Sequence, residues 1–238
     1  MIVLGIETSG ERGSVAVVRD EGLLAEYYFP EGHRHARNIM VGIDEVVGRA
    51  GVGKREINAV AVTQGPGSFT GLRVGVTCAK TLAWALGWRA VGVPTLDVLA
   101  QNVLPERRPD AEHAAPAAVC PLLDARRSFV YGAVFLRQGE RWVDSTGMIA
   151  GPPAQVAARI PPGTLIFGTG VAAYPEVFGS PGSAVWSVGP EELARGHARH
   201  TAWLGLRLLR EGKDVNPLKL LAMYYRPTEA EEKLSKRR

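Results

Sequence analysis

The chain has 238 residues, of which 46% are hydrophobic and 22% charged, and its formal net charge is +4. This length fits one large domain or two small ones, and either arrangement can bury a hydrophobic core. No apolar run approaches the ~20 residues that a membrane-spanning helix needs. Because the chain enters an apolar run at residues 2–6 without a basic segment or cleavage site, we expect a cytoplasmic protein without a signal peptide.

The cysteines and the distribution of charge further restrict what kind of protein this chain is. Cys78 and Cys120 fall within predicted core elements and are expected to be reduced thiols. The positive charge allows contact with nucleic acid but does not establish it, because the arginines are scattered. The only dense basic cluster is the tail at residues 233–238, and such tails are usually solvated.

The first half of the chain alternates between strand and helix patterns. Short apolar runs bounded by turn residues predict three strands, at residues 2–7, 14–19 and 22–29. Apolar residues at helical spacing and terminal glycines then predict a helix at 35–50, a strand at 58–63, a helix at 68–86, a strand at 88–93 and a helix at 95–104. The order is therefore βββαβαβα.

The second half repeats this order without repeating the sequence. Strands are predicted at 117–120, 128–136 and 141–143, then a helix at 152–160, a strand at 164–167, a helix near 171–178, a strand at 184–187 and a helix at 190–210. The stretch 105–116 is rich in proline, alanine and charge, and is typical of a linker. We therefore predict two ribonuclease H-like or actin-like lobes, at 1–104 and 117–238, an architecture that commonly holds a nucleotide between its lobes.

The most informative segment is GPGSFTGLRVG, residues 65–75, which joins a strand to a helix. Ser68 or Thr70 can cap the start of this helix, where free N–H groups also attract anions. A phosphate loop would need Lys-Ser/Thr after its last glycine, and Leu72 and Arg73 stand there instead. Gly71 and Gly75 share one helical face, which indicates close approach either of the protein's own sheet or of another protein.

Two glycine-containing turns are candidates for nucleotide contact. In an actin-like lobe the first hairpin would surround phosphates with N–H groups and hydroxyls, and a carboxylate at position 7 could hold hydrated magnesium. An ordinary turn uses the same residue types. The candidate residues are Glu7, Thr8, Ser9, Ser14, Gly168 and Gly170.

The sequence predicts no metal site and no catalytic residues. His33 and His35 are two residues apart and would point to different sides of a helix, while His197 and His200 have no third ligand nearby. We expect these to be solvated surface histidines. No arrangement of nucleophile and base is recognisable either.

Several segments together resemble the bacterial TsaB family, also called YeaZ. They are IVLGIETS, GPGSFTGLRVG, VPTLDVLA, CPLLDARRSFVYGAVF and PLKLLAMYYRPTEAEE. The resemblance runs over nearly the whole chain and implies a two-lobed protein of the ASKHA (actin-like ATPase) superfamily. It also implies a role in making N6-threonylcarbamoyladenosine at position 37 of tRNAs that read ANN codons.

The resemblance implies that the chain is a partner subunit. Family members bind the catalytic subunit TsaD through helices of the first lobe, the ATPase TsaE completes the assembly, and tRNA is reached through the complex. Family members alone form homodimers through the same face. The residues expected at this face are Ile39, Gly42, Ile43, Phe69, Gly71, Leu72, Arg73, Gly75 and Val76.

The resemblance also implies a non-catalytic role with no required cofactor. The catalytic relative has a metal-binding His-x-x-x-His at positions that align here with Thr95 and Leu99, which cannot replace imidazoles. A metallopeptidase activity therefore has no chemical basis. ATP or ADP remains open as a ligand, although Glu7 stands where aspartate is usual. The alternative is an ASKHA-type ATPase or small-molecule kinase that uses Asp97 or Asp124 as a base.

Overall fold

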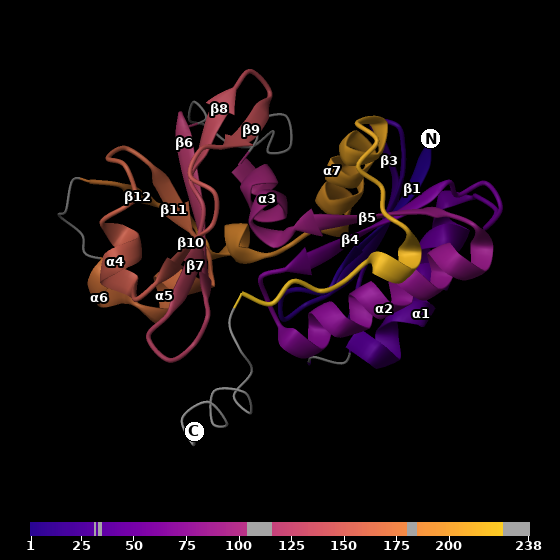
Figure 1. Ribbon diagram of the computed structural model, residues 1–238, viewed down its shortest axis with the longest axis horizontal. Helices are drawn as coiled ribbons and strands as arrows, with labels where there is room; N and C mark the ends of the chain where they lie inside the picture. Colours follow the sequence, from indigo (N-terminus) through magenta and orange to yellow (C-terminus); the bar gives the residue numbers. More distant parts are fainter. Residues whose placement is uncertain (31, 33–34, 104–115, 180–184, 226–238) are drawn as a thin grey trace.

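The computed structural model describes residues 1–30, 32, 35–103, 116–179 and 185–225. Figure 1 shows these residues as two lobes, each built on its own β-sheet. The predicted linker, apart from residue 116, and the basic tail lie outside the described residues. Among the described helices, none is both long enough and apolar enough to cross a membrane.

The first lobe has the predicted element order. It consists of β1 (Ile2–Glu7), β2 (Ser14–Arg19), β3 (Gly22–Tyr28), α1 (His35–Ala50), β4 (Ala59–Gly65), α2 (Phe69–Leu86), β5 (Arg89–Pro94) and α3 (Thr95–Ala100). The sheet order is β3-β2-β1-β4-β5; β1 is antiparallel to β2 and parallel to β4, and β4 is parallel to β5.

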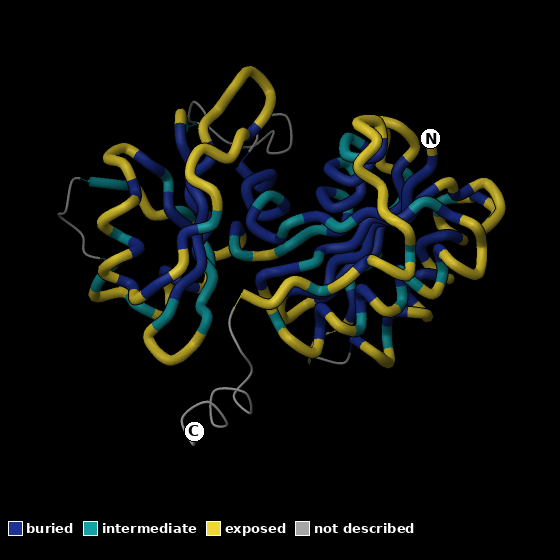
Figure 2. Tube along the Cα trace, in the orientation of Figure 1, coloured by how far each residue is buried: buried dark blue, intermediate teal, exposed yellow. Residues whose placement is uncertain are grey.

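The central strands β1 and β4 are apolar on both sides because helices cover both faces of the sheet. Alternate residues point to opposite faces, so Leu4 and Val62 join a core under α1 and α2. Val3 and Ala61 join a second core on the other face. Figure 2 shows these strands buried at the centre of the lobe, with exposed residues on the outer sides of the helices.

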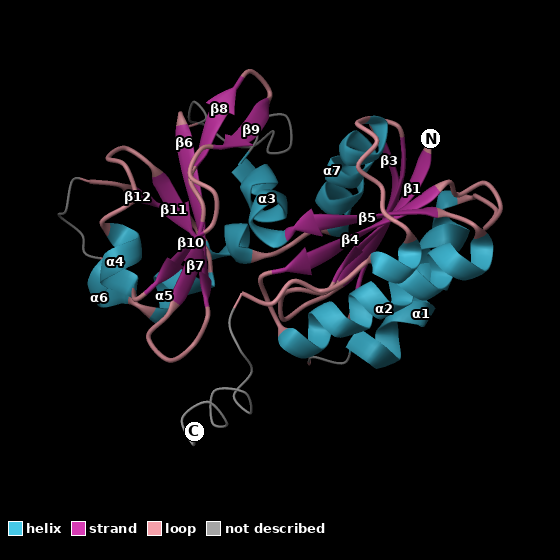
Figure 3. Cartoon of the chain, in the orientation of Figure 1, coloured by secondary structure: helices cyan, strands magenta, loops and turns pink. Residues whose placement is uncertain are grey.

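The second lobe contains a seven-stranded sheet and short helices (Figure 3). Its elements are β6 (Ala118–Asp124), β7 (Val130–Gly132), β8 (Phe135–Gln138), β9 (Arg141–Asp144), β10 (Ile149–Gly151), α4 (Pro153–Ala157), β11 (Leu165–Phe167), α5 (Thr169–Ala173), α6 (Pro175–Phe178) and β12 (Ser187–Val188). The two-lobed architecture is confirmed, but five strands rather than three precede the first helix of this lobe.

The predicted strand at 128–136 is interrupted because Val134 leaves the ladder. Its N–H donates to the Thr146 hydroxyl, and its carbonyl accepts from the Ser145 N–H. Strand β7 therefore pairs with the end of β6 and with β10, while β8 pairs with the start of β6 and with β9.

The last long helix, α7 (Ala198–Arg210), was expected in the second lobe but packs on the first sheet, against β1, β2, β4 and β5. Two glycines allow this close packing. A Cβ on Gly5 would lie under 3.0 Å from the carbonyl oxygen of Ala198, and one on Gly205 would lie equally close to Ala61. The first lobe is therefore completed by residues from near the end of the chain.

The segment after α7 returns along the first lobe. Val215 bridges to Ala90, and a short 3-10 helix at Pro217–Lys219 packs on α2. The Met223 N–H then donates to the Gln64 carbonyl, and the Tyr225 ring lies 6.2 Å from that of Tyr131 in the second lobe. This C-terminal segment, gold in Figure 1, thus borders α2 and reaches both lobes.

Candidate functional site

Helix α2 begins as predicted. The Ser68 hydroxyl accepts a hydrogen bond from the Gly71 N–H at 3.2 Å, which confirms Ser68 as the cap. The helix ends at Gly87, whose φ of 68° is left-handed and whose N–H donates to the Ala83 carbonyl. These two signals fix the length of the helix that lies beside α1.

Gly42 on α1 and Gly71 and Gly75 on α2 face inward, not toward a partner. A Cβ on Gly71 or Gly75 would lie under 3.0 Å from atoms of Thr8, and one on Gly42 would lie under 3.0 Å from the Phe29 ring. Of the two explanations for these glycines, packing inside the lobe is therefore the correct one. They let both helices approach the sheet and the loop after β1.

Seven of the nine predicted interface residues are buried, so they form the inner face of the helix pair. They are Ile39, Gly42, Ile43, Gly71, Leu72, Gly75 and Val76. Only Phe69 and Arg73 are exposed. The prediction selected the apolar stripe of each helix, and this stripe serves the core because the core must be filled first.

The outer face of the helix pair nevertheless carries exposed apolar side chains alongside charged ones. Its exposed members include Val41 on α1, which is 63% exposed, and Trp84 on α2, which is 69% exposed. We call this surface the docking face and define it as Met40, Val41, Phe69, Arg73 and Trp84. In the sequence, the docking face is marked by apolar residues that do not follow the helical spacing of the buried residues. Val41 and Trp84 are the clearest examples.

Several contacts order the docking face. The Cys78 thiol lies 3.8 Å from the Met40 sulfur, which joins the two helices. The Phe69 ring contacts the Arg73 guanidinium, with 5.1 Å between Cζ and the ring centroid, and the Tyr224 ring, with centroids 4.8 Å apart. Burial raises the pKa of the Cys78 thiol to about 11, so it remains protonated at neutral pH.

The hairpin from β1 to β2 contains four predicted nucleotide-binding residues, and all four are buried. Glu7 is fully buried, and one of its carboxylate oxygens accepts from the Ser9 N–H at 2.6 Å and from the Ser9 hydroxyl at 2.5 Å. Burial raises the pKa of Glu7, although the hydrogen bonds from Ser9 oppose this effect. Gly196 covers the carboxyl group so closely that a Cβ there would lie 2.7 Å from Glu7 Cδ.

The other predicted nucleotide contacts also have structural roles. Ser14 is buried, and its hydroxyl accepts from the Ala198 N–H at the start of α7. Thr8 is buried under α2. Gly168 and Gly170 both pack against Leu122 of β6. In this structure, the side chains of Glu7, Thr8 and Ser14 therefore present no surface to a ligand.

The histidines were expected at the surface, but three of them are buried or half-buried. His35 and His200 are buried, and His197 is half-buried with its ring 5.4 Å from that of His200. Burial, and then Arg199 and Arg195, lower the pKa of His197 to about 4. No cluster of three or more metal-ligating side chains occurs within the ranges that the structure describes.

The two candidate bases occupy different environments. Asp124 accepts from the Arg126 N–H at 2.7 Å and from the Tyr174 hydroxyl at 3.1 Å, which holds it in a turn. Asp97 lies on α3, where burial and then the charge of Asp144 raise its pKa to about 6. Thr95 and Leu99, on the same helix, are buried and offer no metal ligand.

The paired sheets, with helices α1 and α2 on one face of the first and α7 on the other, define a two-lobed α/β protein with the ribonuclease H-like or actin-like architecture expected from the sequence. A family model described as "TsaD: tRNA N6-adenosine threonylcarbamoyltransferase" matches residues 30–174. The chain therefore belongs to this family, and the relatives that it resembles include proteins named TsaB.

These relatives include two named "tRNA threonylcarbamoyladenosine biosynthesis protein TsaB". The protein from Bacillus subtilis is 33% identical over 57% of this chain and 55% of its own length, and that from Escherichia coli is 33% identical over 58% and 56%. A tRNA N6-adenosine threonylcarbamoyltransferase from Porphyromonas gingivalis is 33% identical over 54% of this chain and 42% of its own length. The chain thus matches about half the length of these relatives.

A likeness in structure extends further than the sequence match. The solved structure described as YeaZ from Pseudomonas aeruginosa superposes with a TM-score of 0.78 and covers 94% of this chain and 100% of its own, at 24% identity. At this identity the likeness establishes the two-lobed fold alone.

Proposed function

We propose that this chain acts in tRNA threonylcarbamoyladenosine biosynthesis as a non-catalytic partner subunit that binds and activates a TsaD-type catalytic subunit. The family match and the TsaB-named relatives support the pathway. The observation that carries the partner role is the docking face, where large apolar side chains from both helices lie in the open.

Exposing such an apolar surface to water is energetically unfavourable unless a partner covers it. Contiguous exposed apolar side chains on a monomer usually mark an interaction site, and aromatic residues and arginine are enriched at the centres of interfaces. Trp84 and Phe69 supply aromatic area, and Arg73 lies over the Phe69 ring. The face therefore has the composition of a protein interface.

The proposed occupant is a related chain with the same helix pair. Two copies of one fold can meet through equivalent helices about a pseudo-twofold axis, and a second copy of this chain can then take the same place when the partner is absent. In the assembly, a TsaE-type ATPase and tRNA would be engaged through the complex.

A non-catalytic role accords with the chemistry of the residues that the sequence offered as candidates. Thr95 and Leu99 provide no imidazole, and the Glu7 carboxyl group is sealed beneath Gly196. The raised pKa of Asp97 favours the alternative of an ATPase or kinase that acts between the lobes. ATP turnover by the isolated chain, alone and with sugar acceptors, tests this alternative: absence of both hydrolysis and phosphorylated product above a no-protein blank eliminates it.

The proposed role is tested by reconstituting tRNA modification with TsaD-type and TsaE-type subunits, with and without this chain. Val41→Asp places a charge on the docking face and should abolish both co-purification with the TsaD-type subunit and modification. The matched control is Val188→Asp on β12, since Val188 is 50% exposed on the other lobe. Equal binding by both folded variants would disprove the docking face.

A further inference from the structure

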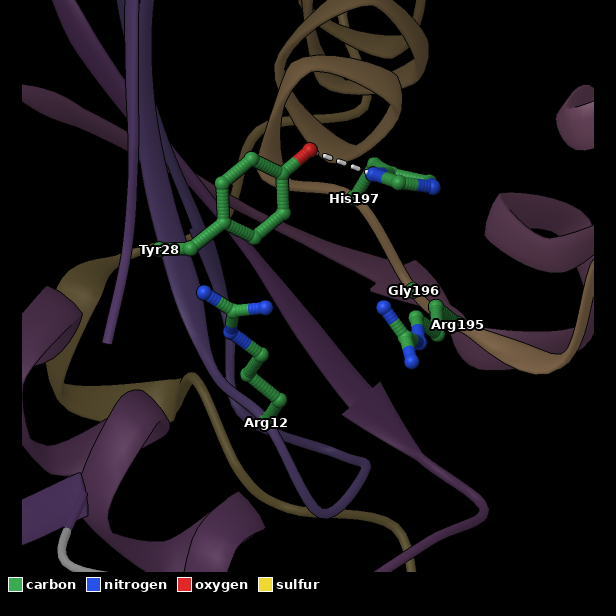
Figure 4. A pocket seen from close by; sticks show the side chains of 5 residues that line it. All are labelled: Arg12, Tyr28, Arg195, Gly196 and His197. Atoms are coloured by element: carbon green, nitrogen blue, oxygen red, sulfur yellow. Dashed lines mark hydrogen bonds between the residues drawn. The ribbon is translucent and has the colours of Figure 1, made fainter. Parts of the chain in front are cut away.

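A separate cavity of about 180 Å³ lies on the first lobe, away from the docking face. It is lined by Arg12, Tyr28, Arg195, Gly196 and His197. Figure 4 shows the Arg12 guanidinium beside the Tyr28 ring, Arg195 on the opposite side near Gly196, and the Tyr28 hydroxyl directed at His197. None of these five residues was among the predicted nucleotide contacts.

The Arg12 side chain and the backbone at Arg195 are held in place. The Arg12 Nε donates to the Phe29 carbonyl at 3.2 Å, and its Cζ lies 5.3 Å from the centroid of the Tyr28 ring. The buried Asn102 amide donates to the carbonyl of Arg195 at 2.8 Å. Both arginines therefore emerge from fixed positions in the loops that precede β2 and α7.

Within the described part of the chain, the two arginines have no carboxylate partner, although Glu26 is near. The Glu26 carboxylate is paired with Arg199. It accepts from the Arg199 guanidinium at 2.7 Å and from the Arg199 backbone N–H at 3.2 Å. Among the ranges that the structure describes, neither Arg12 nor Arg195 forms an ion pair with an acidic side chain. The cavity thus carries two positive charges that nothing on its walls compensates.

The other polar groups in the wall are neutral. Burial raises the pKa of the Tyr28 phenol, so it keeps its proton, which it donates to Glu26 at 2.9 Å. The lowered pKa of His197 keeps its imidazole uncharged near neutral pH, and the charge of Arg195 contributes to this effect. An anion entering the cavity would therefore meet positive charge without a nearby free carboxylate.

We propose that Arg12 and Arg195 form a binding site for a phosphoryl group. Guanidinium groups bind phosphate oxygens through paired N–H donors, and this pairing is strongest where the donors are already positioned. The cavity is smaller than the roughly 300–1,000 Å³ of pockets that enclose a whole small-molecule ligand. It therefore holds the anionic group of a ligand whose remainder extends outside.

Such a group has two possible sources, a small phosphorylated molecule such as a nucleotide or the backbone of RNA. The experiment compares the wild-type chain, the double variant R12Q/R195Q and the control R159A. Arg159 is an exposed arginine beyond α4 on the second lobe. Circular dichroism first establishes that all three are folded, and the single variants R12Q and R195Q provide a second set.

One arm of the experiment measures the change in Tm caused by inorganic phosphate and by ATP against chloride of equal ionic strength. Calorimetry then gives the affinities. Since hydrogen bonds between charged groups are the stronger ones, each arginine removed should weaken phosphate binding at least about tenfold. The other arm measures tRNA binding against salt, where losing two phosphate contacts should reduce the log–log slope by about 2.

The two sources give different results. Loss of the phosphate and ATP effects with an unchanged tRNA slope identifies a small phosphorylated ligand, whereas a reduced slope identifies RNA. If the double variant matches R159A in both arms, the proposal is wrong. Because the isolated chain is used throughout, failure here leaves the docking face untouched.

Discussion

The packing role of Gly75 leads to a prediction about stability. In Gly75→Ala the new Cβ would lie under 3.0 Å from the hydroxyl of Thr8, a short, buried side chain that cannot move aside. Overpacking of this kind costs about 1–3 kcal/mol, whereas replacing a helical glycine with alanine returns up to about 1 kcal/mol. The free energy of unfolding should therefore fall by roughly 1–2 kcal/mol.

Gly48→Ala is the matched control. Gly48 lies on the exposed side of α1, and a Cβ there would meet nothing within 4 Å. Only the helix-propensity effect remains, so this variant should be about 0.5–1 kcal/mol more stable than wild type. The two glycine substitutions should thus change stability in opposite directions.

Thr8→Ala tests the cause of the clash. The Thr8 hydroxyl has no hydrogen-bond partner among the described residues, so removing it should recover most of the stability lost in Gly75→Ala. Urea unfolding followed by circular dichroism gives all four corners of the double-mutant cycle. A coupling energy near zero, or a Gly75→Ala variant as stable as Gly48→Ala, would refute the packing explanation.

Three further predictions concern pH, capping and the C-terminal segment. The folded pKa of Asp97 is about 6 and its ordinary value is 3.8, so wild-type stability should fall as pH rises from about 4 to about 6. Asp97→Asn should flatten this part of the unfolding profile and add up to about 3 kcal/mol at pH 7.5. Ser14→Ala removes the acceptor for the first N–H of α7 and should cost about 1 kcal/mol or more in urea unfolding. Tyr224→Ala removes the ring that packs on Phe69 and should increase amide hydrogen exchange at Met223 while leaving exchange in β1 unchanged.

The first lobe was predictable because its signals are local. Buried strands such as β1 and β4 are continuous apolar runs, and α2 carries both a serine cap and a terminal glycine. Each of these features depends on residues within a few positions of one another. The element order and the cap at Ser68 therefore followed from the sequence.

The features that were not predictable depend on which elements meet in space. Sequence order placed α7 with the second lobe, whereas Gly5 and Gly205 seat it on the first sheet. The spacing of Gly71 and Gly75 indicates a close approach but does not identify what approaches. The exposed positions Val41 and Trp84 become distinguishable from core positions only when the inner face of each helix is known.

The hairpin before β2 connects the two surfaces proposed here. Its Thr8 end packs under Gly75 of α2, and the Ser9 carbonyl accepts from the Ser68 N–H at 2.7 Å. Its other end carries Arg12, which lines the cavity between Tyr28 and Arg195. In a nucleotide-binding lobe, the backbone of this hairpin would surround phosphates. Here α2 and the loop before α7 pack against that part of the hairpin instead. The site proposed for a phosphoryl group therefore uses a side chain at the outer end of the hairpin. The packing of α2 against the inner end of the hairpin also positions α2, which carries part of the docking face.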